Sequence, residues 1–171
     1  MDRFTLPKLE HRIAEVGAMV YRRRAPVQPV LWLDDWSKEA LSAGADEAGW
    51  TAVETPHHWG GRDVKATIRA RFRLPAEWQG EAVALRVELS QGLDVSGPDA
   101  TAYIDGVARQ GVDIYHHEIL LPADLPAGEH LLVLEAYSGT KPDRHWFGGV
   151  DLVSIDSEVR GYYYDAKVAL D

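Results

Sequence analysis

The sequence predicts a mainly β protein: an antiparallel β-sandwich of the jelly-roll kind, with one helix at each end. In the middle of the chain, apolar and polar residues alternate with a period of two, and turns rich in Gly, Pro and Asp separate these stretches. Near both ends, apolar residues recur every three or four positions instead, as in amphipathic helices. Many short strands divided by regular turns are typical of sandwiches and jelly rolls. We therefore expect a helix in 1–25, a β-sandwich in 26–155 and a helix in 156–171.

The first segment is predicted to form an amphipathic helix over about residues 6–22. Its apolar residues have helical spacing, and they are Leu6, Leu9, Ile13, Val16 and Val20. Thr5 is suited to cap the helix and Pro7 to occupy its first turn. The basic run at 22–24 is interpreted as cations at the C-terminal end of this helix, where they interact favourably with its dipole.

The clearest strands are the stretches "ATIRARFRL" and "AVALRVEL". In the first, Ile68, Ala70, Phe72 and Leu74 fall on one face, and Thr67, Arg69, Arg71 and Arg73 fall on the other. This alternation is that of a half-buried strand, and the second stretch repeats it. We expect the two to be strands of one antiparallel sheet, joined by the link "PAEWQGE".

Further strands are indicated on both sides of these two. Asp105-Gly106 lies between short apolar runs and favours the positive φ angles of a two-residue hairpin turn. A short apolar strand is expected at 30–33, and "HEILLP", "HLLVLEAY" and "GGVDLVSI" add three more. The predicted total is eight or nine strands.

The last segment returns to helical spacing, with Asp156 or Ser157 as its cap. The apolar residues of its stripe are Val159, Tyr162, Tyr163, Ala166 and Leu170. Because this stripe continues to the end of the sequence, we expect it to dock on a further domain or on a second copy of the chain. Left bare, such stripes would favour aggregation.

Composition argues against several classes of protein. A net charge of -9 and a pI near 5.2 do not suit nucleic-acid binding, which relies on clustered Lys and Arg. The absence of cysteine removes disulfides, thiolate nucleophiles and cysteine-based zinc sites. The sequence shows neither a secretory signal nor an apolar run of about 18 residues, so we expect no membrane partner and a cytoplasmic location.

Four motifs carry a family resemblance: "HRIAEV"; "WGGRD" followed by "RARFRLPAEW"; "AYIDGV" with "LPAGEHLLVLEAYSG"; and "YYYDAKVAL". In this order they resemble the N-terminal domain of the family 38 glycoside hydrolases, the α-mannosidases. The middle portion is also similar to the sugar-binding jelly-roll domain of family 2 glycosidases. The family 2 aromatic residue before the strand is absent, since Ala66-Thr67-Ile68 stand there. The terminal helices fit only the mannosidase interpretation, and both resemblances imply a galactose-binding-like sandwich.

The resemblance implies an accessory domain of an α-mannosidase. Enzymes of that family are retaining hydrolases that hold zinc in a larger catalytic domain, and none of the motifs of that domain matches this sequence. We therefore assign no catalytic residue, no metal ligand and no cofactor to this chain, which we expect to be inactive alone. Its implied role is to support and orient the mannosidase catalytic domain. The alternative is a free module that binds mannose-type carbohydrate weakly.

The candidate contact residues lie in two places. Trp59 and Trp146 are expected to be exposed in Gly-rich loops, "HWGGRD" and "RHWFGG", and Arg62 and Asp63 follow the first ring. One exposed ring and a few hydrogen bonds would bind a sugar with millimolar affinity at best, about -4 kcal/mol, so contact with the catalytic domain is the more economical role.

The second place is His116-His117, of which one residue is expected to face a ligand or a neighbouring domain. Alternation along a strand would separate the two rings, which argues against a shared metal. A structural calcium site would need Asp94, Asp99 and nearby carbonyl groups. The other tryptophans are expected to fill the core or brace its edges, and they are Trp32, Trp36, Trp50 and Trp78.

Overall fold

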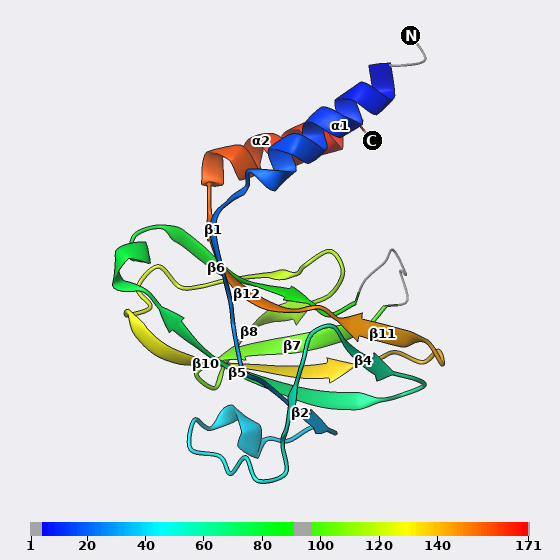
Figure 1. The fold of residues 1–171 in the computed structure, drawn as a ribbon, viewed down its shortest axis with the longest axis vertical. Helices are drawn as coiled ribbons and strands as arrows, with labels where there is room; N and C mark the ends of the chain where they lie inside the picture. Colours follow the sequence, from blue (N-terminus) through cyan, green and yellow to red (C-terminus); the bar gives the residue numbers. More distant parts are fainter. Residues whose placement is uncertain (1–4, 91–96, 171) are drawn as a thin grey trace.

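The computed structural model describes residues 5–90 and 97–170. It consists of a β-sandwich with two helices that extend from one end of it (Figure 1). The helices are α1 (Thr5–Ala18) and α2 (Ser157–Leu170), with short 3-10 helices η1 (Glu39–Leu41) and η2 (Ala76–Trp78). The strands are β1 (Tyr21–Pro26), β2 (Val30–Asp34), β3 (Thr51–Val53), β4 (His57–Gly60), β5 (Lys65–Leu74), β6 (Ala82–Glu88), β7 (Asp99–Ile104), β8 (Val107–Val112), β9 (Glu118–Leu120), β10 (Gly128–Tyr137), β11 (Arg144–Phe147) and β12 (Gly149–Ile155). The predicted fold class, a mainly β sandwich with a helix at each end, is confirmed.

The strands form two facing sheets and a small third one. The larger sheet has the order β3-β2-β5-β10-β7-β8, the smaller has the order β1-β12-β6-β9, and β11 pairs with β4 alone. All the ladders within these sheets are antiparallel. The core lies between the two large sheets and includes the fully buried residues Ile68, Leu85, Val87, Ile104, Ile119, Leu132 and Leu134.

The expectation that the strands around residues 70 and 85 share a sheet is wrong. β5 pairs with β2 and β10, whereas β6 pairs with β12 and β9 in the opposite sheet. The link between them contains η2, whose Trp78 is buried, and it carries the chain from one sheet to the other. Alternation identifies the buried face of a strand, but it does not identify the strand's partners.

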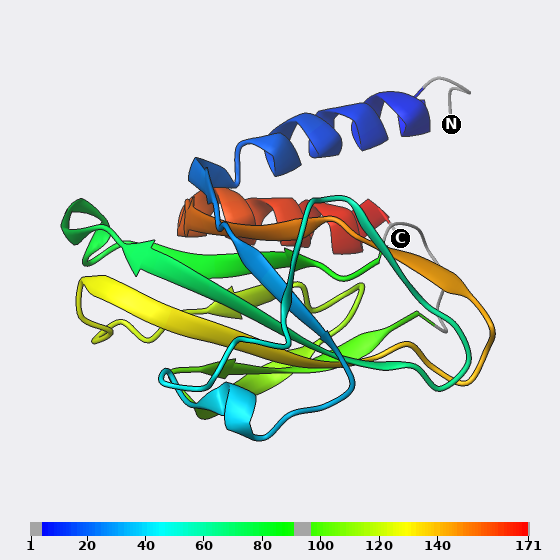
Figure 2. The same cartoon turned by 60° about the horizontal axis from the view of Figure 1, so that its bottom comes forward.

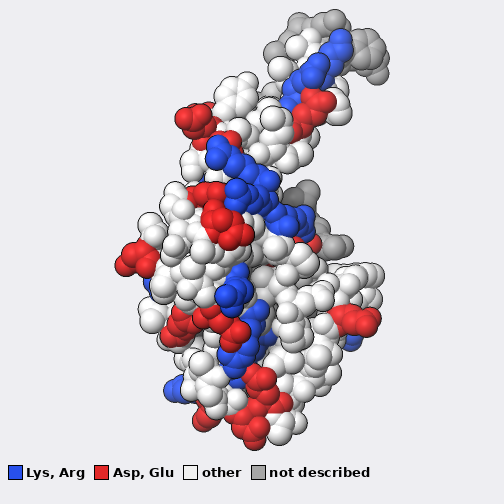
Figure 3. Space-filling model, turned by 60° about the vertical axis from the view of Figure 1, so that its left-hand side comes forward, with Lys and Arg blue, Asp and Glu red and all other residues white. Residues whose placement is uncertain are grey.

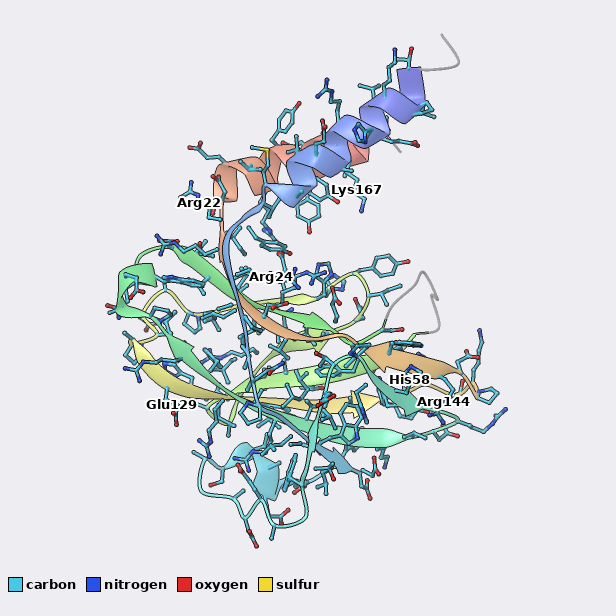
Figure 4. All side chains as sticks on the ribbon, viewed as in Figure 1. Arg22, Arg24, His58, Glu129, Arg144 and Lys167 are labelled. Carbon is cyan, nitrogen blue, oxygen red and sulfur yellow. The ribbon has the colours of Figure 1, made fainter. Side chains whose placement is uncertain are left out.

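The basic run does not end a helix, because α1 stops at Ala18 and residues 22–24 belong to β1. β1 is held by its ladder to β12 and by three ion pairs: Arg22–Asp156 at 2.7 Å, Arg23–Glu81 at 3.3 Å and Arg24–Asp151 at 2.6 Å. Figure 4 labels Arg22 and Arg24 on this strand, and Figure 3 shows basic and acidic side chains close together on this side of the molecule. The sandwich therefore begins at about residue 21 rather than 26.

The predicted hairpin turn is confirmed between β7 and β8. Asp105 and Gly106 have φ angles of 51° and 77°, the left-handed region that a two-residue turn of this kind requires. The Asp105 carboxylate also accepts hydrogen bonds from the Leu131 backbone N–H at 2.9 Å and from the His130 ring at 2.7 Å. The turn is thus tied to the neighbouring strand β10.

The outer face of the larger sheet is covered by residues 35–50, so β5 is buried on both faces along much of its length. Arg69 is only 1% exposed, and its Nη2 donates to the Ser42 carbonyl at 3.1 Å. Its Nη1 lies 3.3 Å from a Glu47 carboxylate oxygen, and its guanidinium lies 5.5 Å from the centre of the Trp50 ring. The expectation of a half-buried strand is therefore wrong at Thr67 and Arg69, because a distant segment covers them.

Of the four tryptophans expected to fill the core or brace its edges, two lie in the core and two pack against the outer face of the larger sheet. Trp32 and Trp78 are buried, and Trp50 is partly buried against the outer face of the larger sheet. Trp36 is exposed, but its indole N–H donates to the Ala136 carbonyl at 2.9 Å and the Lys65 ammonium lies 4.5 Å from its ring centre. Trp36 therefore braces the covering segment rather than filling the core.

The two terminal helices form an antiparallel pair, here called the helical hairpin (Figures 1 and 2). Neither helix contains a fully buried residue. Asp156 caps α2, because its Oδ1 accepts hydrogen bonds from the backbone N–H groups of Glu158 and Val159, both at 3.1 Å. Within the described ranges, no helix has the length and apolar character needed to cross a membrane.

Candidate functional site

The two Gly-rich segments that were expected to be loops form paired strands. β4 and β11 run antiparallel, with Trp59 opposite His145 and Trp146 opposite His58. This pairing brings Trp59 and Trp146 to the same edge of the molecule, here called the β4–β11 edge. Side chains alternate along each strand, so the two rings fall on opposite faces.

Trp59 faces the core, and the expectation that its ring is exposed is wrong. It is 4% exposed, its indole N–H donates to the Leu89 carbonyl at 3.3 Å, and its ring packs edge-on against Trp32. His57, two positions earlier on the same face, lies 4.8 Å from Trp32, and burial lowers its pKa. The sequence carried no clear signal for these strands, because in "RHWF" the polar His145 is buried and the apolar Trp146 is exposed.

Trp146 faces solvent, as expected, and is 42% exposed. Its ring centre lies 3.8 Å from that of His58, so the two side chains form one exposed aromatic surface. Figure 4 shows His58 and Arg144 together at this edge, away from the helices. The edge therefore displays two flat rings beside an exposed guanidinium.

The turn that follows β4 is held in place by backbone conformation and by contacts with residues 137–145. Gly60 has a φ angle of 96°, and a Cβ added there would lie 2.7 Å from the His145 ring, so this position requires glycine. Asp63 accepts a hydrogen bond from the Tyr137 hydroxyl, and this bond raises the pKa of Tyr137. Asp63 is therefore already engaged, whereas Arg62 is exposed.

His116 and His117 do not join the β4–β11 edge. Both lie in the loop between β8 and β9, and they line separate cavities of about 500 and 540 Å³. His116 shares its cavity with Asp99 and Asp113, and its Nδ1 lies 3.0 Å from Asp113. Burial, followed by the nearby Asp113 carboxylate, raises the pKa of Asp99.

Of the two candidate calcium ligands named above, Asp94 lies outside the described residues and Asp99 is the first residue of β7. Across residues 5–90 and 97–170, no three His, Cys, Asp or Glu side chains are grouped so that they could hold a metal ion.

His117 lines the cavity between the helical hairpin and the sandwich, together with residues of α1, α2, β1 and β6. At its base, the Glu118 side chain is 7% exposed and accepts hydrogen bonds from the Tyr21 hydroxyl at 2.5 Å and from the Arg160 Nε at 3.0 Å. Burial, followed by the bond to Glu118, raises the pKa of Tyr21 above its usual range. Sequence reasoning missed this group, since its members come from three distant segments without any shared motif.

Comparisons with known proteins support the fold. No family model matches the chain, and no curated protein matches it. Similar solved structures include a glycosyl hydrolase family 2 member from Bacteroides cellulosilyticus, with 13% identity and a TM-score of 0.59 over 78% of this chain and 20% of that one. A β-glucuronidase from an uncultured Clostridium sp. has 11% identity and a TM-score of 0.56 over 80% of this chain and 30% of that one.

A β-glycosidase from Bacteroides vulgatus is similar to the same extent, with 14% identity and a TM-score of 0.55 over 78% of this chain and 20% of that one. The chain thus spans only 20–30% of the length of these proteins. At such low identity the likeness establishes a shared fold. The chain has the β-sandwich fold that occurs as one part of these longer glycoside hydrolases.

Proposed function

We propose that this chain is a non-catalytic β-sandwich domain of a glycoside hydrolase and that it supports and orients the catalytic domain. The observation that carries the proposal is that the same fold forms a minor part of much longer glycosidases. The parent enzyme would hold its catalytic residues elsewhere. Such a domain needs a contact surface rather than an active site of its own.

The finer proposal is that the parent enzyme is a cytoplasmic, zinc-dependent, retaining α-mannosidase of family 38. It is supported by the motifs "WGGRD", "RARFRLPAEW" and "YYYDAKVAL" and by the helices at both ends. The zinc would belong to the catalytic domain. The solved structures named above are of family 2 and other β-glycosidases, so this specificity rests on the sequence motifs alone.

The β4–β11 edge is the surface that we assign to the catalytic domain. It presents Trp146, His58 and Arg144 on two paired strands, and Arg62 in the turn that follows β4. An aromatic ring that loses its water at an interface, next to arginines able to form charge-assisted hydrogen bonds, is a typical anchor for a domain contact. Contacts between domains of one chain are usually modest in area and partly polar, which suits this edge.

The test is an assay of the isolated chain beside the product of the whole coding sequence. We expect the isolated chain to leave aryl glycosides intact and the longer product to hydrolyse an aryl α-mannoside. Hydrolysis of an aryl β-glucuronide instead would overturn the mannosidase assignment and leave the domain role standing. Turnover by the isolated chain, or a coding sequence without any glycosidase domain, would overturn the role itself.

The second candidate function is a free carbohydrate-binding module, and the exposed Trp146–His58 surface favours it. In this case the Trp146 indole resonance should shift when mannose is added to about 50 mM, well above the weak affinity expected of one exposed ring. The Trp59 indole is an internal control, because it is buried and bonded to Leu89. An unchanged Trp146 resonance would exclude this candidate.

A further inference from the structure

The helical hairpin carries an apolar groove to which the sandwich contributes no lining residue. The groove has a volume of about 250 Å³ and lies between the two helices, lined chiefly by Leu9, Ile13, Val16, Tyr162, Ala166 and Leu170. Leu9 is 43% exposed and Tyr162 is 65% exposed. The groove faces a different side of α2 from the cavity above the sandwich, which Tyr163, Tyr164 and Lys167 line.

The hairpin is too small to be stable through its own contacts. Each helix has 14 residues and is about 21 Å long, and isolated helices of this length are marginal in water. Most helical stability in proteins comes from the packing of an apolar face. Val159 and Tyr163 of α2 pack partly on the sandwich, but neither helix has a fully buried residue. A partner that fills the groove would supply the missing burial.

The charges of the hairpin suit a second copy of itself. Its basic residues are Lys8, Arg12, Arg160 and Lys167, and its acidic residues are Glu10, Glu15, Glu158 and Asp165. The two sets balance, although the whole chain has a net charge of -9. The excess negative charge therefore lies outside the hairpin, and two hairpins can meet without net repulsion where two sandwiches would repel each other.

We propose that the groove binds the hairpin of a second copy, so that two chains form an antiparallel four-helix bundle around a two-fold axis. Such an interface uses the same patch on both copies and requires only that the patch be self-complementary. Figures 1 and 2 show the hairpin at one end of the molecule, where a second hairpin can approach. This proposal concerns a different surface from the β4–β11 edge and does not depend on the domain role.

The size of the hairpin sets the strength of the dimer. Two helices side by side present a face of about 400 Å² per copy, so the bundle would bury about 800 Å² in total. Specific interfaces usually bury about 1,200–2,000 Å², so we expect a weak and reversible dimer. The average molecular mass in solution should rise from 19.0 kDa toward twice that value as the concentration of the chain increases.

Sedimentation equilibrium of the chain, from about 10 μM to 1 mM, tests the proposal. We expect Leu9→Asp and Tyr162→Asp to abolish the dimer, because each places a charge in the groove. The matched control is Val168→Asp, since Val168 is on the same helix and is 75% exposed. It lies about 120° around the helix from Tyr162, outside the groove lining, and should leave the dimer intact.

Disulfide trapping gives a second readout that does not depend on the Asp variants. Because the chain has no cysteine, a single Tyr162→Cys substitution provides one defined thiol. Mild oxidation should join Tyr162→Cys chains into covalent dimers several times faster than Val168→Cys chains. Three results would each overturn the proposal: a chain that stays monomeric at about 1 mM, equal loss of the dimer in Val168→Asp, or equal trapping at both positions.

Discussion

The sandwich and the helical hairpin are both marked in the sequence by regular apolar spacing, but they differ in what covers their apolar faces. In the sandwich, residues such as Ile68, Leu85 and Leu134 are completely buried between two sheets. In the hairpin, Leu9 and Tyr162 belong to an equally regular stripe and remain largely exposed. A periodic pattern thus indicates the type of secondary structure and leaves open whether the same chain buries it.

Because of this difference, shortening an apolar side chain should destabilise the protein more in the sandwich than in the hairpin. Leu134→Ala should lower the free energy of unfolding by about 3 kcal/mol, because it removes methyl groups from a close-packed core. Leu9→Ala should cost less than about 1 kcal/mol, since its side chain is already half in water. Urea denaturation of the dilute chain measures both values. Equal losses would mean that the hairpin is as well packed as the sandwich.

A second contrast in stability is expected between two arginines: one buried on the outer face of the larger sheet and one exposed on α1. Arg69→Ala should cost about 2 kcal/mol, since it removes the bond to Ser42 and the packing under Trp50. Arg12→Ala, which loses only an exposed pair with Glu15 on α1, should cost less than about 0.5 kcal/mol. Hydrogen exchange should show faster opening of residues 35–50 in Arg69→Ala, and unchanged exchange there would contradict its assigned role.

At the junction between hairpin and sandwich, the Tyr21–Glu118 bond should make the stability of the chain depend on pH in the alkaline range. Burial and the bond to Glu118 raise the pKa of Tyr21. As the pH rises above about 10, the ordinary tyrosine value, the unfolded chain loses a proton that the folded chain keeps, so stability falls. Tyr21→Phe should remove this part of the slope and, at neutral pH, cost about 1 kcal/mol for a half-buried hydrogen bond.

Denaturation curves at pH 8 to about 11 measure this effect, with Tyr115→Phe as the control because Tyr115 is 65% exposed and lies outside the hairpin groove. A Tyr21→Phe slope equal to that of the unaltered chain would show that the Tyr21–Glu118 contact does not persist in solution.

The smallest effect is expected at the cap of α2. The backbone hydrogen bond from Val159, followed by the bond from Arg22, lowers the pKa of Asp156. The stabilisation is therefore present above about pH 3.9, the ordinary aspartate value, and is lost as the pH falls through the lower folded value. Asp156→Ala should speed amide exchange at Glu158 and Val159 more than Asp156→Asn, which keeps a capping oxygen. Equal exchange in the two variants would argue against capping.

The sequence alone was sufficient for features that depend on neighbouring residues. The alternation in "ATIRARFRL" and "AVALRVEL" identified β5 and β6, and Asp105-Gly106 identified the hairpin turn. The apolar spacing identified α2, and Asp156 was one of the two residues expected to cap it. In each case the backbone preference or hydrogen bond lies within a few residues along the chain, so the local pattern contains the physical cause.

The candidate site was only partly predictable, because several of its contacts join residues that are far apart in the sequence. Trp146 is exposed as expected, and it lies at the same edge as Trp59, Arg62 and Asp63. The burial of Trp59 was missed because two short segments were interpreted as loops rather than as strands. His116 and His117 lie elsewhere, and the Tyr21–Glu118–Arg160 group joins residues that are up to 139 positions apart.

Only the tertiary structure decided which segments meet. It separated β5 and β6 into opposite sheets, ended α1 before the arginines of β1 and covered Arg69 with residues 35–50. These outcomes depend on contacts between residues far apart in sequence, whose energies no local pattern reports. The sequence by itself determined the strands, the turn and the apolar stripes, whereas long-range packing determined which of their faces are buried and which remain exposed for a partner.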